Sequence, residues 1–117
     1  MFSAGEAIRA SEPMLFWENQ FFDDVEEQDL HAFYDTIAAL GYRHIWMLDN
    51  FGNLMLAECS YAALRDLNRY IISQERYACT RTTYYTDVLA TTDRHLERAR
   101  QAVSEYRTAM IERPQAM

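Results

Sequence analysis

Two polar side chains, Glu18 and Asn19, directly follow a short apolar run at residues 14–17 (Met-Leu-Phe-Trp). Such a run predicts a buried β-strand, and open α/β sheets bind ligands at the carboxyl ends of their strands. We therefore take Glu18 and Asn19 as the candidate substrate-binding residues. The alternative is that Glu18 only caps the following loop or helix.

Acidic residues are concentrated after this point. Four of them precede a predicted helix: Asp23, Asp24, Glu26 and Glu27. Carboxylates in a loop could hold a hard cation, but acids before a helix usually form a solvated face that complements the helix dipole. Glu27, His31 and Asp35 follow at intervals of four on one helix face. They could also seat a metal, although surface ion pairing is the more common outcome. We expect no metal.

The remaining histidines and an irregular arginine-containing segment give weaker indications. His44 and His95 have no visible partner in the sequence, so neither is a credible ligand or base. Arg76 and Arg81 flank a segment that could contact a phosphate or sugar-phosphate, but a plain surface loop is the alternative. No catalytic residue can be assigned.

Composition restricts the classes of partner. The formal net charge is −7 and all 11 basic residues are arginine, which argues against nucleic-acid binding because that affinity depends on basic contacts to phosphate. Nothing resembles a signal peptide or a membrane span. Cys59 and Cys79 could form one disulfide. Two free thiols in a reducing cytoplasm are the expected state, which predicts a cytoplasmic protein.

The elements that must position these residues follow from hydrophobic spacing. Leu30, Phe33, Ile37 and Leu40 form the stripe of an amphipathic helix, which Gly41 ends in a left-handed conformation with Tyr42 packed back on Ile37. Further elements are strands at 44–48, 54–56 and 84–90, a turn at 49–53, a helix after the N-cap Ser60, and a last helix between Asp93 and Pro114.

The first strand, the helix and the second strand form a βαβ unit, which predicts parallel pairing in an α/β sheet with strands covered on both faces. The fold class is therefore α/β, with a mixed sheet of about four strands, flanking helices and a long C-terminal helix. Only a dozen residues precede the first strand, so we expect the chain to open in the middle of a larger sheet.

Four features follow one another along the chain: Pro13 to Asn19 (Pro-Met-Leu-Phe-Trp-Glu-Asn), Leu40-Gly41-Tyr42, the turn at 49–52, and residues 85–90 (Tyr-Thr-Asp-Val-Leu-Ala). This order resembles the C-terminal half of FkbM-type methyltransferases, which depend on S-adenosylmethionine. The resemblance covers roughly residues 4–90. It divides the chain into 1–90, the acceptor-side half of a methyltransferase-like domain, and 91–117, an amphipathic helix and tail.

The resemblance implies a partial Rossmann-like methyltransferase sheet. Its final strand inserts antiparallel between the first two, which places residues 14–17 at an edge where a further strand would pair. In the family, the acid that matches Glu18 lies on the acceptor-substrate side. The family's Gly-rich turn and ribose-binding acid have no counterpart here, since the only glycines are Gly5, Gly41 and Gly52.

Two functional hypotheses follow. The first is a methyltransferase fragment that transfers methyl from S-adenosylmethionine to a small-molecule or sugar hydroxyl only when a cofactor-binding half completes it; this chain alone binds no cofactor. The second is a non-catalytic interaction or oligomerisation module derived from that fold. Either hypothesis implies a homodimer or a complex with a cofactor-binding partner half. An apolar edge strand favours association, and so does the last helix, whose apolar residues recur at intervals of three and four and form a stripe suited to helix packing.

Overall fold

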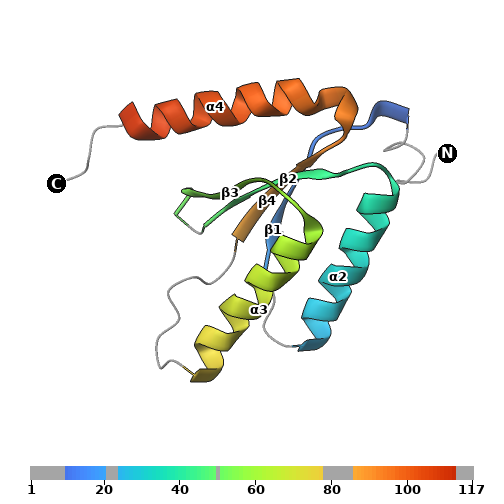
Figure 1. The fold of residues 1–117 in the computed structure, drawn as a ribbon, viewed down its shortest axis with the longest axis vertical. Helices are drawn as coiled ribbons and strands as arrows, with labels where there is room; N and C mark the ends of the chain where they lie inside the picture. The colour runs from blue at the N-terminus through green and yellow to red at the C-terminus, as the bar shows by residue number, and fades with distance from the viewer. Residues whose placement is uncertain (1–9, 21–23, 50, 78–85, 113–117) are drawn as a thin grey trace.

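The computed structural model describes residues 10–20, 24–49, 51–77 and 86–112. The elements in these segments are β1 (Leu15–Asn19), α2 (Asp24–Ala39), β2 (His44–Leu48), β3 (Leu54–Cys59), α3 (Tyr61–Tyr77), β4 (Thr86–Thr91), a single 3₁₀ turn (Asp93–His95) and α4 (Leu96–Glu112). The helices α2 and α3 cover one face of the sheet and α4 lies over the other (Figure 1). The fold class is therefore α/β, as the sequence predicts.

The four described strands form one sheet in the order β1-β4-β2-β3, and every neighbouring pair is antiparallel. The insertion of the last strand between the first two is confirmed. The predicted parallel pairing and mixed sheet are wrong: the helix connection leaves β1 and β2 pointing the same way, but β4 separates them and pairs with both. Residues of β1 lie at an edge of the sheet, as expected.

The core fills the space between the sheet and the helices α2 and α3. Its buried side chains come from both helices, the central strands and the turn after α2: Tyr34, Ile37, Tyr42, Ile45, Met47, Leu64, Val88 and Ala90. On β2, Ile45, Trp46 and Met47 are all buried, which confirms that this strand is covered on both faces. The prediction is wrong for β1, where Phe16 on the α4 face is 63% exposed.

The end of α2 is the local structure that the sequence specifies most completely. The Tyr42 N–H donates to the Ile37 carbonyl (3.1 Å) and the Gly41 N–H donates to the Ala38 carbonyl (3.0 Å), the two bonds of a Schellman motif. Gly41 has φ +97°, and both Tyr42 and Ile37 lie in the core. The predicted ending is confirmed. The start of α3 is confirmed too, since the Ser60 hydroxyl accepts the Ala63 N–H (3.2 Å).

The strand predicted at 54–56 is longer than expected, because β3 continues to Cys59 through an irregularity in its pairing with β2. Glu58, near its end, has φ +51°, a left-handed conformation that is uncommon for residues other than glycine. Cys59 is a free, half-buried thiol whose pKa is raised by burial. Cys79 and the start of the strand predicted at 84–90 lie outside the described residues.

Gly41→Ala is expected to lower the free energy of unfolding by about 1 kcal/mol, because an L-residue resists the left-handed conformation. A Cβ at this position would meet only Thr92 Cγ2, at an ordinary 3.8 Å, so the loss reflects the backbone. Urea unfolding measures it. Gly41→Asn is the matched control and should lose less, since asparagine tolerates this conformation. Equal losses in both variants would contradict the backbone explanation.

Candidate functional site

Glu18 and Asn19 project from opposite faces of the sheet. In the pairing of β1 with β4, Glu18 lies opposite Asp87 and Asn19 opposite Thr86, and successive strand residues alternate between faces. Asn19 is 1% exposed and lies on the side of α2 and α3, whereas Glu18 is exposed on the side of α4. The structure therefore does not bring the two predicted substrate-binding residues into one site.

Asn19 is the hub of a buried polar network. Its Nδ2 donates to Asn68 Oδ1 (2.8 Å) and to Thr86 Oγ1 (3.2 Å), and its Oδ1 accepts a hydrogen bond from the Tyr34 hydroxyl. Asn68 Nδ2 in turn donates to the Tyr34 oxygen (3.0 Å). None of the four side chains is more than 1% exposed. The network ties together β1, α2, α3 and β4, so Asn19 has a structural role.

Tyr34 is held in its neutral form by this environment. Burial raises the pKa of its hydroxyl to about 12, with the hydrogen bonds of Asn68 and Asn19 acting in the opposite direction. Its ring also packs at a tilt against Tyr61, with centroids 5.8 Å apart. Burial raises the pKa of Tyr61 as well. A phenol this far from ionisation serves as a fixed hydrogen-bonding group near neutral pH.

Two of the three residues spaced four apart on α2, Glu27 and Asp35, form ion pairs, as the commoner alternative predicts, although Glu27 is buried. Among the described residues, His31 has no ion-pair partner. Asp35 accepts a hydrogen bond from Arg65 Nη2 (2.5 Å). Glu27, fully buried, lies 2.9 Å from Arg69 Nη2, a charge contact without hydrogen-bond geometry. Burial lowers the pKa of His31, against the opposing effect of the Glu27 carboxylate.

Glu18 and Asp87 form a pair of carboxylates on the α4 face. They lie directly opposite each other on neighbouring strands, and burial raises the pKa of Asp87. Asp87 also lines a cavity of about 330 Å³ between the sheet and α4, together with Phe16, Leu48 and Leu89. We call this the Phe16 cavity. Its lining is almost wholly apolar, with a carboxylate at its rim.

The chemistry available at this rim is hydrogen-bond acceptance. Two carboxylates placed side by side can accept a proton or a hydrogen bond from a hydroxyl group whose apolar body occupies the cavity. Like charges directly opposite each other are unfavourable on a sheet, so a bound donor would relieve the repulsion. Glu18 therefore remains a candidate substrate-binding residue, and Asp87 becomes a second candidate beside it.

One histidine prediction needs correction. His44 Nε2 lies 2.6 Å from Asp93 Oδ1, so His44 does have a partner. The sequence did not show it because Asp93 is 49 positions away and reaches His44 through the pairing of β2 with β4. His95 Nε2 lies 3.4 Å from the Ser11 carbonyl oxygen. Both contacts are structural.

Several predicted sites lie outside the described residues. These include Asp23, Arg81, and the side chains of Asp24, Arg76 and Tyr77. Within the part of the chain that the structure describes, no three or more histidine, cysteine or acidic side chains are grouped as a metal would require. No described helix is both long and apolar enough to cross a membrane.

The residues missed from the sequence are Asn68 and Thr86, together with the polar role of Tyr34. Asn68 left a signal: it lies four positions after Leu64 and three before Ile71, on the buried face of α3. A polar residue in an apolar stripe requires a buried partner. Thr86 gave no comparable signal in the sequence, because threonine is common in β-strands.

Comparison of the chain with models of protein families, with curated proteins and with solved structures finds no match.

Tyr34→Phe is expected to lower the free energy of unfolding by roughly 1–3 kcal/mol, because it leaves buried polar atoms of Asn19 and Asn68 without a partner. Urea unfolding measures the loss. Tyr70→Phe is the matched control on α3: its side chain is 58% exposed, so the same substitution should change stability by less than about 0.5 kcal/mol. Similar effects in the two variants would show that the network contributes little.

Proposed function

We propose that this chain is the acceptor-side half of an S-adenosylmethionine-dependent methyltransferase of the FkbM type, acting on a small-molecule or sugar hydroxyl. In this proposal the chain holds the acceptor, and a cofactor-binding half docks along the free edge of β1. That half belongs to another chain or to another part of a longer product. The sheet is then a partial Rossmann-like sheet that the second half completes.

The observation that carries the proposal is the strand order β1-β4-β2. Two strands that point the same way are joined through a helix, and a later strand is inserted antiparallel between them. This is the arrangement that the resemblance to the methyltransferase family implies for residues 14–90. The strand order supports only the fold part of the proposal, so the evidence for the function must come from the side chains of the site.

The site supports an acceptor rather than a cofactor. Glu18 lies at the carboxyl end of β1, where open α/β sheets bind ligands, and Asp87 adjoins it over the apolar Phe16 cavity. The two glycines that the structure describes do not suit a cofactor: Gly41 ends α2 and Gly52, at φ +87°, lies in the hairpin turn. A dinucleotide-type phosphate site needs glycines between a strand and the following helix.

The proposal predicts that the isolated chain does not bind S-adenosylmethionine in the micromolar range, and that a complex isolated from the source cell with a tagged chain does. Isothermal titration calorimetry measures both. Glu18→Ala should leave the stability of the chain and cofactor binding by the complex unchanged, because Glu18 is exposed, but lower the rate of methyl transfer by the complex.

Three results would contradict the proposal: saturable binding to the chain alone, a purified complex that binds no S-adenosylmethionine, or an unchanged transfer rate in a Glu18→Ala complex of normal stability. Glu26→Ala is the control, since Glu26 is an exposed acid on α2, on the other side of the sheet from Glu18.

A second candidate function, a non-catalytic interaction module, is favoured by the outer edge of β1. Among the strands that the structure describes, β1 has a neighbour on one side only, and its α4 face carries Phe16 at 63% exposure. Edge strands present unpaired N–H and C=O groups that recruit another chain. A symmetric homodimer through β1 is the simplest closed assembly of this kind.

Both functions predict that the chain associates through β1. Light scattering coupled to gel filtration should detect a homodimer at tens of micromolar, or a complex with the partner half. Phe16→Lys should weaken either assembly, because a charge on the edge opposes pairing. Phe51→Lys is the control, since Phe51 is 73% exposed but lies in the hairpin turn. A monomer in both tests, or equal weakening by both substitutions, would contradict edge pairing.

A further inference from the structure

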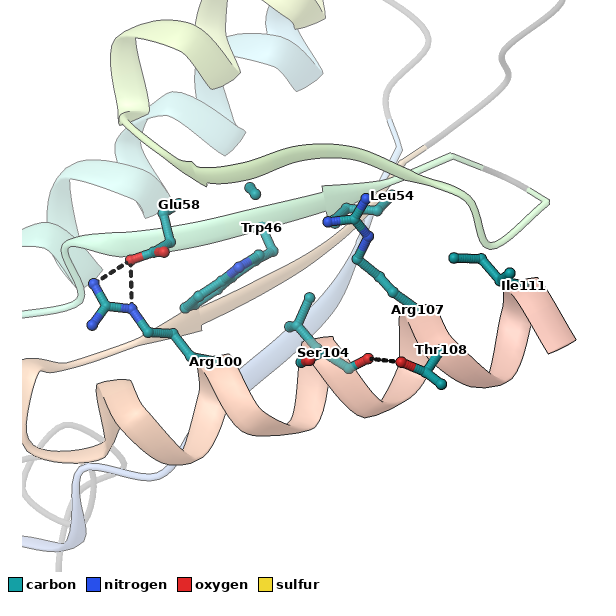
Figure 2. A pocket seen from close by; sticks show the side chains of 10 residues that line it. Trp46, Leu54, Glu58, Arg100, Ser104, Arg107, Thr108 and Ile111 are labelled. Atoms are coloured by element: carbon teal, nitrogen blue, oxygen red, sulfur yellow. Dashed lines mark hydrogen bonds and ion pairs between the residues drawn. The ribbon is translucent and has the colours of Figure 1, made fainter.

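A second cavity, of about 380 Å³, lies on the other flank of α4, between this helix and β3 (Figure 2). We call it the Trp46 cavity. Trp46 lies in it between the side chains of Arg100 and Arg107, and Leu54, Val103 and Ile111 supply further apolar surface. Its volume is in the range of small-molecule sites, and its combination of apolar surface with a few polar groups is typical of them.

Glu58, which lines one wall of the Trp46 cavity, has a strained backbone conformation. Glu58 adopts the left-handed conformation where the pairing of β2 with β3 is irregular, and such features cluster at functional sites. Its Oε1 accepts hydrogen bonds from Arg100 Nε (2.9 Å) and Nη2 (2.7 Å). Arg100 Nη1 also donates to Glu97 (2.5 Å). The charge of Arg100 is therefore already neutralised.

Arg107 is in a different position. Figure 2 shows it reaching from α4 across the cavity toward Leu54, and it lines the cavity. Among the side chains that the structure describes, none pairs with its guanidinium, and none pairs with the hydroxyl of Ser104 one turn earlier, whose carbonyl accepts the Thr108 hydroxyl (3.1 Å). Arg107 and Ser104 thus present unused hydrogen-bond donors beside an indole.

We propose that the Trp46 cavity binds a small organic carboxylate with a flat apolar body. The planar guanidinium of Arg107 matches a carboxylate through two parallel hydrogen bonds, Ser104 adds a third donor, and Leu54, Val103 and Ile111 contact the apolar body beside the buried Trp46 indole. The charge balance selects a monoanion: Arg107 supplies one uncompensated positive charge, and the two carboxylates that share the Arg100 guanidinium, Glu58 and Glu97, leave an excess negative charge that disfavours a second charge on the ligand. Inorganic phosphate, a mixture of singly and doubly charged forms at neutral pH, has no apolar body and fits this site less well.

This site is separate from the proposed methyltransferase function. It lies on the β3 side of α4, whereas Glu18 and Asp87 lie on the side of β1 and β4. Its test requires neither S-adenosylmethionine nor a partner, so the failure of one proposal leaves the other standing.

The two tryptophans provide the test. Trp46 faces α4, whereas Trp17, paired with Val88, faces α2 and α3. Titration of 2-naphthoate into ¹⁵N-labelled chain should shift the indole N–H resonance of Trp46 saturably, with a Kd of about 1 mM or tighter for a ligand of this size. The resonance of Trp17 should not move. Trp46→Phe and Trp17→Phe assign the two signals.

Arg107→Gln should weaken 2-naphthoate binding by about tenfold or more, because it removes the charged bidentate partner. Arg98→Gln is the matched control: Arg98 is an exposed arginine on the opposite side of α4, nine positions away, and its loss should not change the Kd. Neutral 2-naphthamide and inorganic phosphate should both bind more weakly than 2-naphthoate. Unchanged affinity in Arg107→Gln, equal shifts at Trp17, or phosphate binding as strong as 2-naphthoate would each overturn the proposal.

Discussion

β4 provides the pairing partner for β1 on one side and for β2 on the other, and every other element depends on this double ladder. Residues Leu15 to Asn19 pair with β4 along their whole length, and so do residues His44 to Leu48. Without β4, these two strands would face each other across an empty strand position. The register also decides which residues face each helix layer: Val88 and Ala90 enter the core, while Asp87 and Leu89 face α4.

The buried polar network gives that register a chemical specificity that apolar packing alone lacks. Asn19 and Thr86 are a cross-strand pair on the inner face, and Asn68 and Tyr34 reach them from different helices. A slip of β4 by one residue would move Thr86 to the other face and leave the Asn19 amide without this partner. Errors in such networks strongly destabilise the fold, because each polar atom left unpaired in the interior raises the free energy of the folded state.

Local chemistry explains which parts of this fold could be predicted from the sequence. The end of α2 depends on Gly41 and its immediate neighbours, and the start of α3 depends on Ser60, so each could be predicted from a few adjacent residues. The joint environment of Glu18 and Asn19 could not, and the antiparallel insertion of β4 was expected only from the family resemblance, not from local residue patterns. Both depend on β4, which is almost 70 positions beyond β1. Separations of 49 and 42 positions likewise hide the contact of His44 with Asp93 and that of Glu58 with Arg100 beside Trp46.

The central position of β4 also bears on how the chain acquires its structure. As the last of the four described strands in sequence order, it must enter the middle of the sheet after β1, β2 and β3 have emerged from the ribosome. Contacts between residues so distant in sequence form slowly, and until they form, both edges of the gap remain open to other chains. Nascent chains that end before residue 86 thus hold two unsatisfied strands. Until residues 86–91 have been synthesised and paired, β1 and β2 are the parts of this sheet most exposed to aggregation.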